Sequence, residues 1–328
     1  MEIIKRAGAR LLSGSSSITA LPSAMMLRLT TLAFILFLFT DVPAHAQEKD
    51  APYVPTPASV VEAMLDMAHV GPGDYVIDLG CGDGRIVIAA AKRGATGLGV
   101  DIDEKLIKKA RENAREAGVS DKVMFLKQDL FKTDISGASV ITLYLFPDLI
   151  NKLRPEFTEQ LEPGARIVSH DFDMNDWKPD KHAAIKSNKI LSDTLVPLSE
   201  DERETYSLLH KKLNPQKPLS LLSHDIFYWK VPAKARGQWQ WQTHGKAFTM
   251  AVDQSFNKIH TEIQAGNTAL TIKSKRLRGE RITIRAVNPD TKTRYLLNGR
   301  IEKNTIKGKI QIRSDEGQEI ENWKARRN

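Results

Sequence analysis

The chain lacks several features that would place it in a familiar structural class. Its 328 residues include a single cysteine, Cys81, so no disulfide can form within the chain and a disulfide-stapled scaffold is excluded. Cysteine and histidine do not recur with the spacing of zinc ligands, so the sequence predicts no metal site. An apolar run at residues 29–39 is too short to span a bilayer comfortably.

Length and composition instead fit a globular protein of two domains. A chain of 328 residues exceeds the usual length of one domain, and a hydrophobic content of 41% is enough for a packed core. The net charge is +8 and the isoelectric point is about 9.4. Such a charge suits nucleic acid, an anionic membrane or an acidic protein, so it does not choose a partner by itself.

A glycine-rich turn is the most informative segment. An apolar strand at 75–79 leads into Gly80, Gly82 and Gly84, and a helical run at 85–92 follows at once. Glycines at such a turn let a ligand touch the backbone, and open α/β sheets bind ligands at the carboxyl ends of their strands. The third glycine comes one residue too early for the G-x-G-x-x-G turn of dinucleotide-binding proteins.

Acidic residues around this turn indicate which ligand it holds. Asp78 and Asp83 suit a ligand with a positive amino group and ribose hydroxyls better than a phosphate. S-adenosylmethionine is the simplest ligand of that kind. The alternative interpretation is a chance glycine-rich turn in another α/β protein.

Two more acids follow the next strands. Asp101 ends the strand 96–101, 21 residues after Gly80, where an acid can accept hydrogen bonds from ribose hydroxyls. Asp101 also suits the N-terminus of the helix expected at 104–117, and both roles can hold together. Asp129 follows the strand 123–127 and is placed to accept from an adenine amino group, with Leu130 packed on the ring.

Further strands are expected at 140–145, 165–169 and 226–231. Because strands alternate with helices, the sequence predicts an α/β fold: a Rossmann-like, doubly wound, mostly parallel seven-stranded sheet.

These motifs resemble the class I, seven-stranded methyltransferases. The chain looks most like the branch that contains the ATP synthase c-subunit lysine methyltransferases and their bacterial relatives. The resemblance covers about residues 52–182 and the strand near 226–231. The words that carry it are Tyr53-Val-Pro-Thr-Pro57, Asp78-Leu-Gly-Cys-Gly-Asp-Gly-Arg-Ile-Val-Ile-Ala-Ala90 and Trp177-Lys-Pro-Asp180.

The resemblance implies an S-adenosylmethionine-dependent methyltransferase that N-methylates a protein lysine or another amino group. It assigns Asp78, Gly80 and Gly82 to the methionine end of the cofactor, Asp101 to the ribose and Asp129 to the adenine. It also implies that the segment beginning at Tyr53 closes over the donor. No short motif of this branch names the methyl acceptor.

Candidates for the acceptor side follow the fourth and fifth strands. A lysine acceptor must lose its proton before a single in-line transfer, so a base or a lowered pKa is required. Tyr144 could orient the acceptor or pack in the core, and Asp148 and Asp171 are further candidates. His170 could be a base or a hydrogen-bonded supporting residue.

The N-terminus predicts export to the periplasm. The apolar run 29–39 follows Arg28, and small residues at Ala44 and Ala46 form a signal-peptide cleavage site after Ala46. The alternatives are an uncleaved membrane anchor, which would hold the chain near a membrane, and an organelle transit peptide. Export conflicts with a donor that is made in the cytosol.

The predicted domains are a signal or anchor at 1–46, a methyltransferase domain at 47–232 and a small all-β, barrel-like domain at 237–328. An insertion is expected at about 181–225, with an amphipathic helix at 205–213. In the last domain, short alternating runs are separated by turn signals, among them Asn298-Gly299.

That β domain is rich in Lys and Arg, which either bind a partner or protect strand edges from aggregation. No aromatic–basic RNA-binding motif is present, and no Asn/Asp-Pro-Pro-Tyr follows the fourth strand, so the sequence argues against nucleic acid. The acceptor is then a protein or a small molecule. The rival function is an exported binding module without catalysis.

Overall fold

The computed structural model of the chain describes residues 53–186 and 223–328. The predicted signal segment and the helix expected at 205–213 lie outside these residues, so export stays a prediction. Within the described ranges no helix has the length and apolar character needed to cross a membrane.

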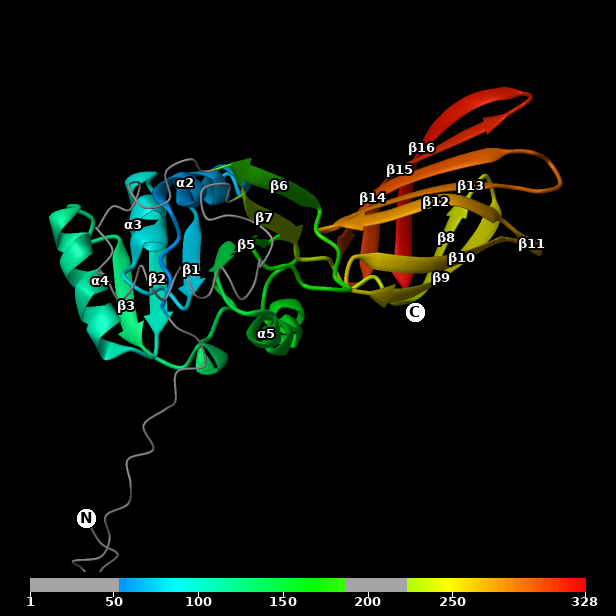
Figure 1. The fold of residues 1–328 in the computed structure, drawn as a ribbon. Helices are drawn as coiled ribbons and strands as arrows, with labels where there is room; N and C mark the ends of the chain where they lie inside the picture. Colours follow the sequence, from blue (N-terminus) through cyan, green and yellow to red (C-terminus); the bar gives the residue numbers. More distant parts are fainter. Residues whose placement is uncertain (1–52, 187–222) are drawn as a thin grey trace, which may run out of the picture. The chain divides into compact units, whose positions relative to one another are not determined.

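The first domain is an α/β sheet in the predicted class (Figure 1). Its seven strands run in the order β3-β2-β1-β4-β5-β7-β6. The strands β1 to β5 are parallel to one another, and β7 is antiparallel to both β5 and β6. The strands are β1 (Tyr75–Leu79), β2 (Thr96–Asp101), β3 (Val123–Lys127), β4 (Val140–Leu143), β5 (Arg166–His170), β6 (Lys181–Lys186) and β7 (Ser223–Lys230).

Helices cover both faces of this sheet. Alternate strand residues point to opposite faces, so Val76 packs with α2 and α3 while Ile77 lies in the cluster that contains α5 residues. The short helix η1 follows β3. The helices are α2 (Ala58–Met67), α3 (Arg85–Lys92), α4 (Glu104–Glu116), η1 (Leu130–Lys132) and α5 (Pro147–Glu159).

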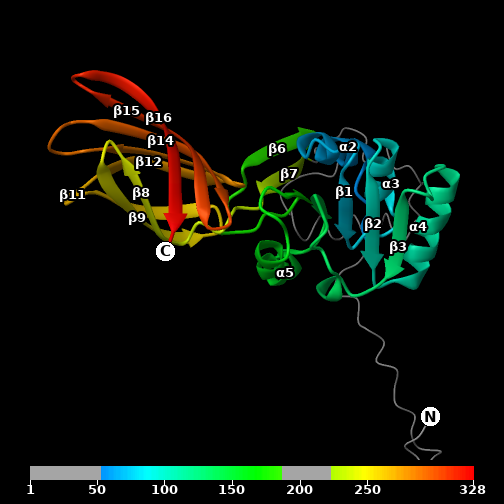
Figure 2. The same cartoon turned by 180° about the vertical axis from the view of Figure 1, so that it is seen from behind.

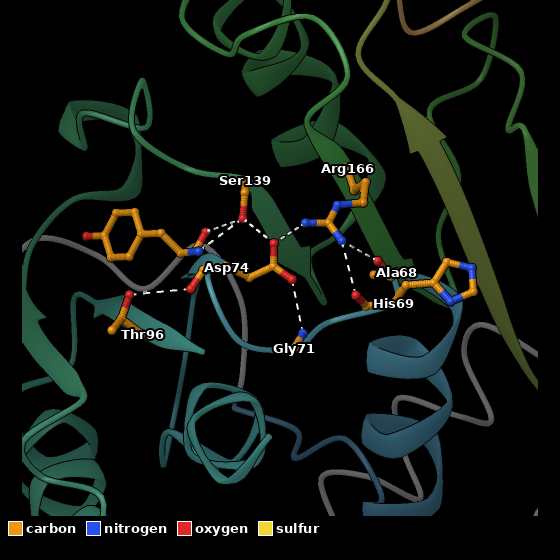
Figure 3. Close-up of polar contacts among 8 residues, drawn as sticks. Ala68, His69, Gly71, Asp74, Thr96, Ser139 and Arg166 are labelled. Atoms are coloured by element: carbon orange, nitrogen blue, oxygen red, sulfur yellow. Dashed lines mark hydrogen bonds and ion pairs between the residues drawn. The ribbon is translucent and has the colours of Figure 1, made fainter. Parts of the chain in front are cut away.

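A polar network joins the amino ends of three strands, at the edge of the sheet opposite the glycine turn (Figure 3). Arg166 forms an ion pair with Asp74 and donates to the Ala68 carbonyl over 2.7 Å. Asp74 also accepts from Ser139 Oγ at 2.8 Å and from the Gly71 amide at 3.0 Å. Burial opposes ionisation of Asp74, but the hydrogen bond from Arg166 and the other donors outweigh it and lower the pKa of Asp74.

The second domain is a nearly closed antiparallel barrel of nine strands, so the prediction of a small β domain was wrong in size (Figure 2). The strands follow the order β11-β10-β9-β8-β16-β15-β14-β13-β12. At the seam, the Leu270 amide donates to the Ile263 carbonyl over 2.8 Å. The strands are β8 (Gly237–Thr243), β9 (Lys246–Ser255), β10 (Lys258–Ala265), β11 (Thr268–Ala269), β12 (Thr271–Arg278), β13 (Arg281–Val287), β14 (Arg294–Glu302), β15 (Thr305–Ser314) and β16 (Gly317–Arg327).

Inward-pointing residues fill the barrel, as alternation predicts. Trp239, Trp241 and Trp323 are all buried in its core. Asn298-Gly299 was predicted as a hairpin turn but lies inside β14. Gly299 pairs with Gly308 on β15, and a Cβ on Gly308 would collide with the Asn298 carbonyl, so two strands approach closely here.

Candidate functional site

The glycine turn connects β1 to α3 and is fixed to β2. Gly80, Gly82 and Gly84 have φ values of 85°, 53° and 81°, a region that favours glycine. The amides of Gly80 and Cys81 both donate to the Val100 carbonyl at 2.9 Å. A Cβ on Gly82 would overlap the ring of Tyr53, so this glycine lets the N-terminal segment lie directly on the turn.

Asp101 at the end of β2 is held by two backbone amides. Its Oδ2 accepts from the Gly82 amide and its Oδ1 from the Asp103 amide, each at 2.9 Å. A carboxylate oxygen has two lone pairs, so each oxygen keeps one for a ligand. The carboxylate is therefore oriented in advance for two hydroxyl donors.

Asp78 lies below the turn and is 2% exposed. Thr142 on β4 donates to its Oδ1 over 2.6 Å. Burial raises the pKa of Asp78 to about 7; the charges of Asp101 and Asp83 act in the same direction, and the Thr142 hydrogen bond acts against them. A positive group at the turn would stabilise the ionised form of this carboxyl.

Asp83 does not share that role. Its carboxylate forms a buried ion pair with Arg85, with Nη2 to Oδ2 at 2.6 Å and Nε to Oδ1 at 2.9 Å. Arg85 also donates to the Thr56 carbonyl over 2.9 Å, which ties the N-terminal segment to α3. The sequence prediction that Asp83 adds free charge beside Asp78 therefore needs correction, because a guanidinium neutralises it.

Asp129 and Leu130 stand where β3 ends, on the same edge of the sheet. Asp129 Oδ1 accepts from the Phe131 amide at 2.9 Å and so begins η1. Leu130 is half-buried and packs against the core cluster around Ile77 and Leu79. Both residues follow the strand next to β2, as an adenine site beside Asp101 requires.

On the acceptor side the fold brings together three of the four predicted candidates, Tyr144, His170 and Asp171. The rings of Tyr144, after β4, and His170, at the end of β5, have centroids 4.0 Å apart. Asp148 is exposed in the first turn of α5, where it also suits the positive end of the helix. Within the described residues no hydrogen bond or ion pair joins Asp148 to His170.

His170 is completely buried and both of its ring nitrogens have neighbours. Its Nδ1 lies 3.2 Å from Thr56 Oγ1 and its Nε2 lies 2.7 Å from His224 Nδ1. Asp171 Oδ2 lies 3.3 Å from His170 Nε2 and 3.4 Å from His224 Nδ1. Burial lowers the pKa of His170 to about 4, although the Asp171 charge opposes this shift, so the ring is neutral near pH 7.

Sequence reasoning missed Thr56 and His224 as members of this group. His224 lies on β7, 54 residues after His170, and only the pairing of β7 with β5 brings the two together. The ligand atoms of His170, Asp171 and His224 converge as metal ligands do. Ligand atoms on tetrahedral zinc lie about 3.4 Å apart, so the 2.7 Å between the two imidazoles corresponds better to a hydrogen bond.

The chain is similar to several proteins of known activity. The family model described as the ANTKMT methyltransferase domain matches residues 78–181. A protein-lysine N-methyltransferase of Saccharolobus islandicus is 43% identical over 130 residues, which cover 39% of this chain and 81% of that protein. A solved RNA methyltransferase from Salinibacter ruber, in complex with S-adenosyl-L-homocysteine, is 44% identical with a TM-score of 0.41, covering 54% of this chain and 93% of that one.

Two further relatives match over a smaller share of their length. A human lysine N-methyltransferase of the ATP synthase c-subunit is 34% identical over 39% of this chain and 55% of its own length. The mouse adenine nucleotide translocase lysine N-methyltransferase is 35% identical over 43% of this chain and 60% of its own length. The glycine turn, the strand order and the extent of the match to the Saccharolobus protein agree: the chain belongs to the protein-lysine N-methyltransferases, a branch of the class I S-adenosylmethionine-dependent methyltransferases.

Proposed function

We propose that this protein transfers the methyl group of S-adenosylmethionine to the side-chain amine of a lysine in another protein. The observation that carries the proposal is the Asp101 carboxylate, fixed by the amides of Gly82 and Asp103 at the glycine turn. The similarity to lysine N-methyltransferases supplies the acceptor class.

The described residues fit the donor. Asp101 has a free lone pair on each oxygen for the ribose hydroxyls. Asp78 beneath the turn offers a carboxyl for the positive amino group, and Gly80 and Gly82 leave the backbone open to the methionine end. When bound, S-adenosylmethionine supplies an electrophilic methyl group on a positively charged sulfur.

Tyr144 is the residue that we place against the acceptor lysine. It is half-buried and follows β4, whereas His170 beneath it is inaccessible to solvent. The chain therefore has to position the amine and exclude water, and an aromatic ring suits the aliphatic stem of a lysine. The amine has to give its proton to water before its lone pair attacks the methyl group and the donor leaves as S-adenosylhomocysteine.

His170 then acts as a positioning residue. Thr56 and His224 hold its ring from two sides, and its face supports the Tyr144 ring. Replacing His170 with Gln, which can keep polar contacts, should retain more activity than replacing it with Ala. If His170 only positions Tyr144, the kcat of His170→Ala should fall while the shape of the pH profile stays unchanged. A lost limb of the profile would instead make His170 the base.

The acceptor class can be tested directly. Purified protein is incubated with S-adenosylmethionine tritiated on its methyl group and a total cell extract, and the protein fraction is hydrolysed to amino acids. Label in methylated lysine supports the proposal. Label in nuclease-sensitive material or in small molecules overturns it, and Asp101→Ala serves as the inactive control.

The His170–His224 contact is tested by metal analysis. One equivalent of metal in the purified protein would contradict a hydrogen-bonded His170–His224 pair.

A further inference from the structure

The excess positive charge of the protein is confined to the barrel. Residues 237–328 contain eighteen Lys and Arg against nine Asp and Glu, so the barrel has a net charge of +9 and the other 236 residues have −1. A general need for solubility would not concentrate the charge in this way. The barrel therefore presents a basic surface whose partner is anionic.

Part of this charge lines one groove of about 650 Å³ on the barrel. Five exposed cationic side chains line it, and no Asp or Glu does. Its apolar lining includes the half-buried side chains of Val287 and Leu296. The cationic residues are Lys273, Arg285, Lys292, Arg294 and Arg313.

Strand register explains how these residues meet. On one face of β13, β14 and β15, Arg285 lies opposite Leu296, while Arg294 lies opposite both Val287 and Arg313. Arginines directly opposite each other on neighbouring strands repel, and the pairing costs stability. Within the described ranges no carboxylate lies in ion-pair distance of Arg285, Arg294 or Arg313. The groove therefore concentrates uncompensated positive charge.

The lining selects among anionic partners. Its one aromatic residue, Tyr295, is buried and packs edge-on against Phe248, so the groove offers no platform for stacking bases. It is concave and carries no exposed aromatic side chain for insertion into a flat bilayer. An extended acidic peptide fits better, because its carboxylates can reach the arginines while its aliphatic carbons cover Val287 and Leu296.

We propose that this groove, here called the arginine groove, is a docking site for an acidic segment of the methyl-accepting protein. The inference rests on the proposed function for the identity of that protein. Docking at the barrel would raise the concentration of the acceptor lysine near the glycine turn without any new contact at the catalytic site.

Binding is tested with a fluorescein-labelled poly-glutamate peptide and the full chain, by fluorescence anisotropy. The triple variant Arg285→Gln, Arg294→Gln and Arg313→Gln should bind the peptide about tenfold more weakly or worse, and added salt should weaken the wild-type affinity. Its melting temperature should equal or exceed that of the wild type, because repulsion between arginines is removed. Loss of binding through misfolding is thereby recognised.

The matched control removes three positive charges elsewhere on the barrel, with Lys246→Gln, Lys324→Gln and Arg326→Gln. If the arginine groove is the site, the control variant should lose less than half as much peptide affinity as the groove variant loses. Equal losses in both triple variants would overturn the proposal. Tighter binding of a single-stranded oligonucleotide, or of vesicles containing phosphatidylserine, than of the peptide would overturn it as well.

A methylation assay distinguishes failure of this inference from failure of the proposed function. The groove variant should label extract proteins with a raised KM and an unchanged kcat. Normal labelling by the groove variant would remove the docking role and leave the lysine methyltransferase intact. Peptide binding without any labelling of lysine by the wild type would remove the proposed function and leave the groove as an anion site.

Discussion

The Asp101 carboxylate accepts the amide hydrogen of Gly82 over 2.9 Å, which joins the end of β2 to the glycine turn after β1. Replacing Asp101 with Ala removes the ribose acceptor and leaves that amide without its partner. We expect S-adenosylmethionine affinity to fall about 100-fold and the free energy of unfolding to fall by about 1 to 2 kcal/mol. Calorimetric titration and denaturant unfolding measure the two effects.

Asp103 provides the control for this substitution. It is two residues away and caps α4 by accepting from the Lys105 amide at 2.9 Å. Asp103→Ala should cost about 1 kcal/mol of stability and leave donor affinity within about twofold. Equal losses of affinity in both variants would show that disturbance of the β2–α4 connection, and not a ribose contact, explains the Asp101 result.

Asp78 is predicted to lower the stability of the fold at pH 8 and to raise its affinity for the donor. Its pKa of about 7 in the folded protein exceeds the ordinary value of 3.8, so its ionisation destabilises the fold as pH rises through that range. Asp78→Asn keeps an acceptor for Thr142 and removes the buried charge. At pH 8 we expect stability to rise by about 2 to 4 kcal/mol while donor affinity falls. Thermal unfolding at pH 8 and at pH 4 checks this, because the gain should vanish at the lower pH.

Gly82 should tolerate no side chain. Gly82→Ala places a methyl group on the Tyr53 ring and requires a φ near 53° that costs about 1 to 2 kcal/mol. Donor affinity should fall more than about tenfold, and Tyr53→Ala in the same chain should restore part of the lost stability. Gly71→Ala is the control, since nothing lies within 4 Å of its Cβ position. If the double variant lost more free energy of unfolding than the two single variants lose together, overlap of the new methyl group with Tyr53 would not be the cause.

The Arg166–Asp74 ion pair should affect stability alone. Both side chains are largely buried at the amino ends of the strands, so Arg166→Ala leaves Asp74 without its main donor and should cost about 3 kcal/mol. Arg93→Ala breaks an exposed ion pair with Glu62 and should cost less than about 1 kcal/mol. Donor affinity of both folded variants should match the wild type. A weaker affinity in Arg166→Ala would mean that the two edges of the sheet are coupled.

The sequence predicted those elements that local pattern determines. The limits of β1, β2, β3 and α3 agree with prediction because each apolar run ends at a glycine or a charged residue. Most residues of strand β12 are exposed, so this strand shows no alternation by which the sequence could locate it. Strand β6 was assigned to an insertion, although it forms the edge of the sheet beside β7.

The candidate site also contains some residues that the sequence could locate and others that it could not. The residues predicted to bind the donor lie at or beside the carboxyl ends of β1, β2 and β3, so the motif placed Asp78, Asp101 and Asp129 at one edge of the sheet without knowledge of the fold. Their contact with the donor stays a prediction. His224 could not be found, because nothing in the sequence relates it to His170 before β7 is paired with β5. The arginine groove was visible only as a surplus of charge, since register decides that Arg294 faces Arg313.

His170 predicts an acid-sensitive fold. Its pKa is about 4 in the folded protein against an ordinary value of 6.5, so the unfolded chain takes up its proton first as pH falls. The contribution of this pKa difference to the free energy of unfolding is complete above about pH 6.5, and about 3 kcal/mol of it is lost by pH 4. Asp78 changes in the opposite sense over the same range, so the wild-type curve alone conceals the effect.

Comparing the wild type with His170→Asn isolates the contribution of His170, because Asp78 contributes equally to both proteins. Asp171, the charge nearest to His170, has a lowered pKa, so its own contribution is lost only below about pH 3.8. The difference in unfolding free energy between wild type and variant should therefore shrink by about 3 kcal/mol from pH 7 to pH 4. Parallel curves across that range would mean that the imidazole takes up its proton as readily in the folded protein as in the unfolded chain, and the neutral pair with His224 would have to be abandoned.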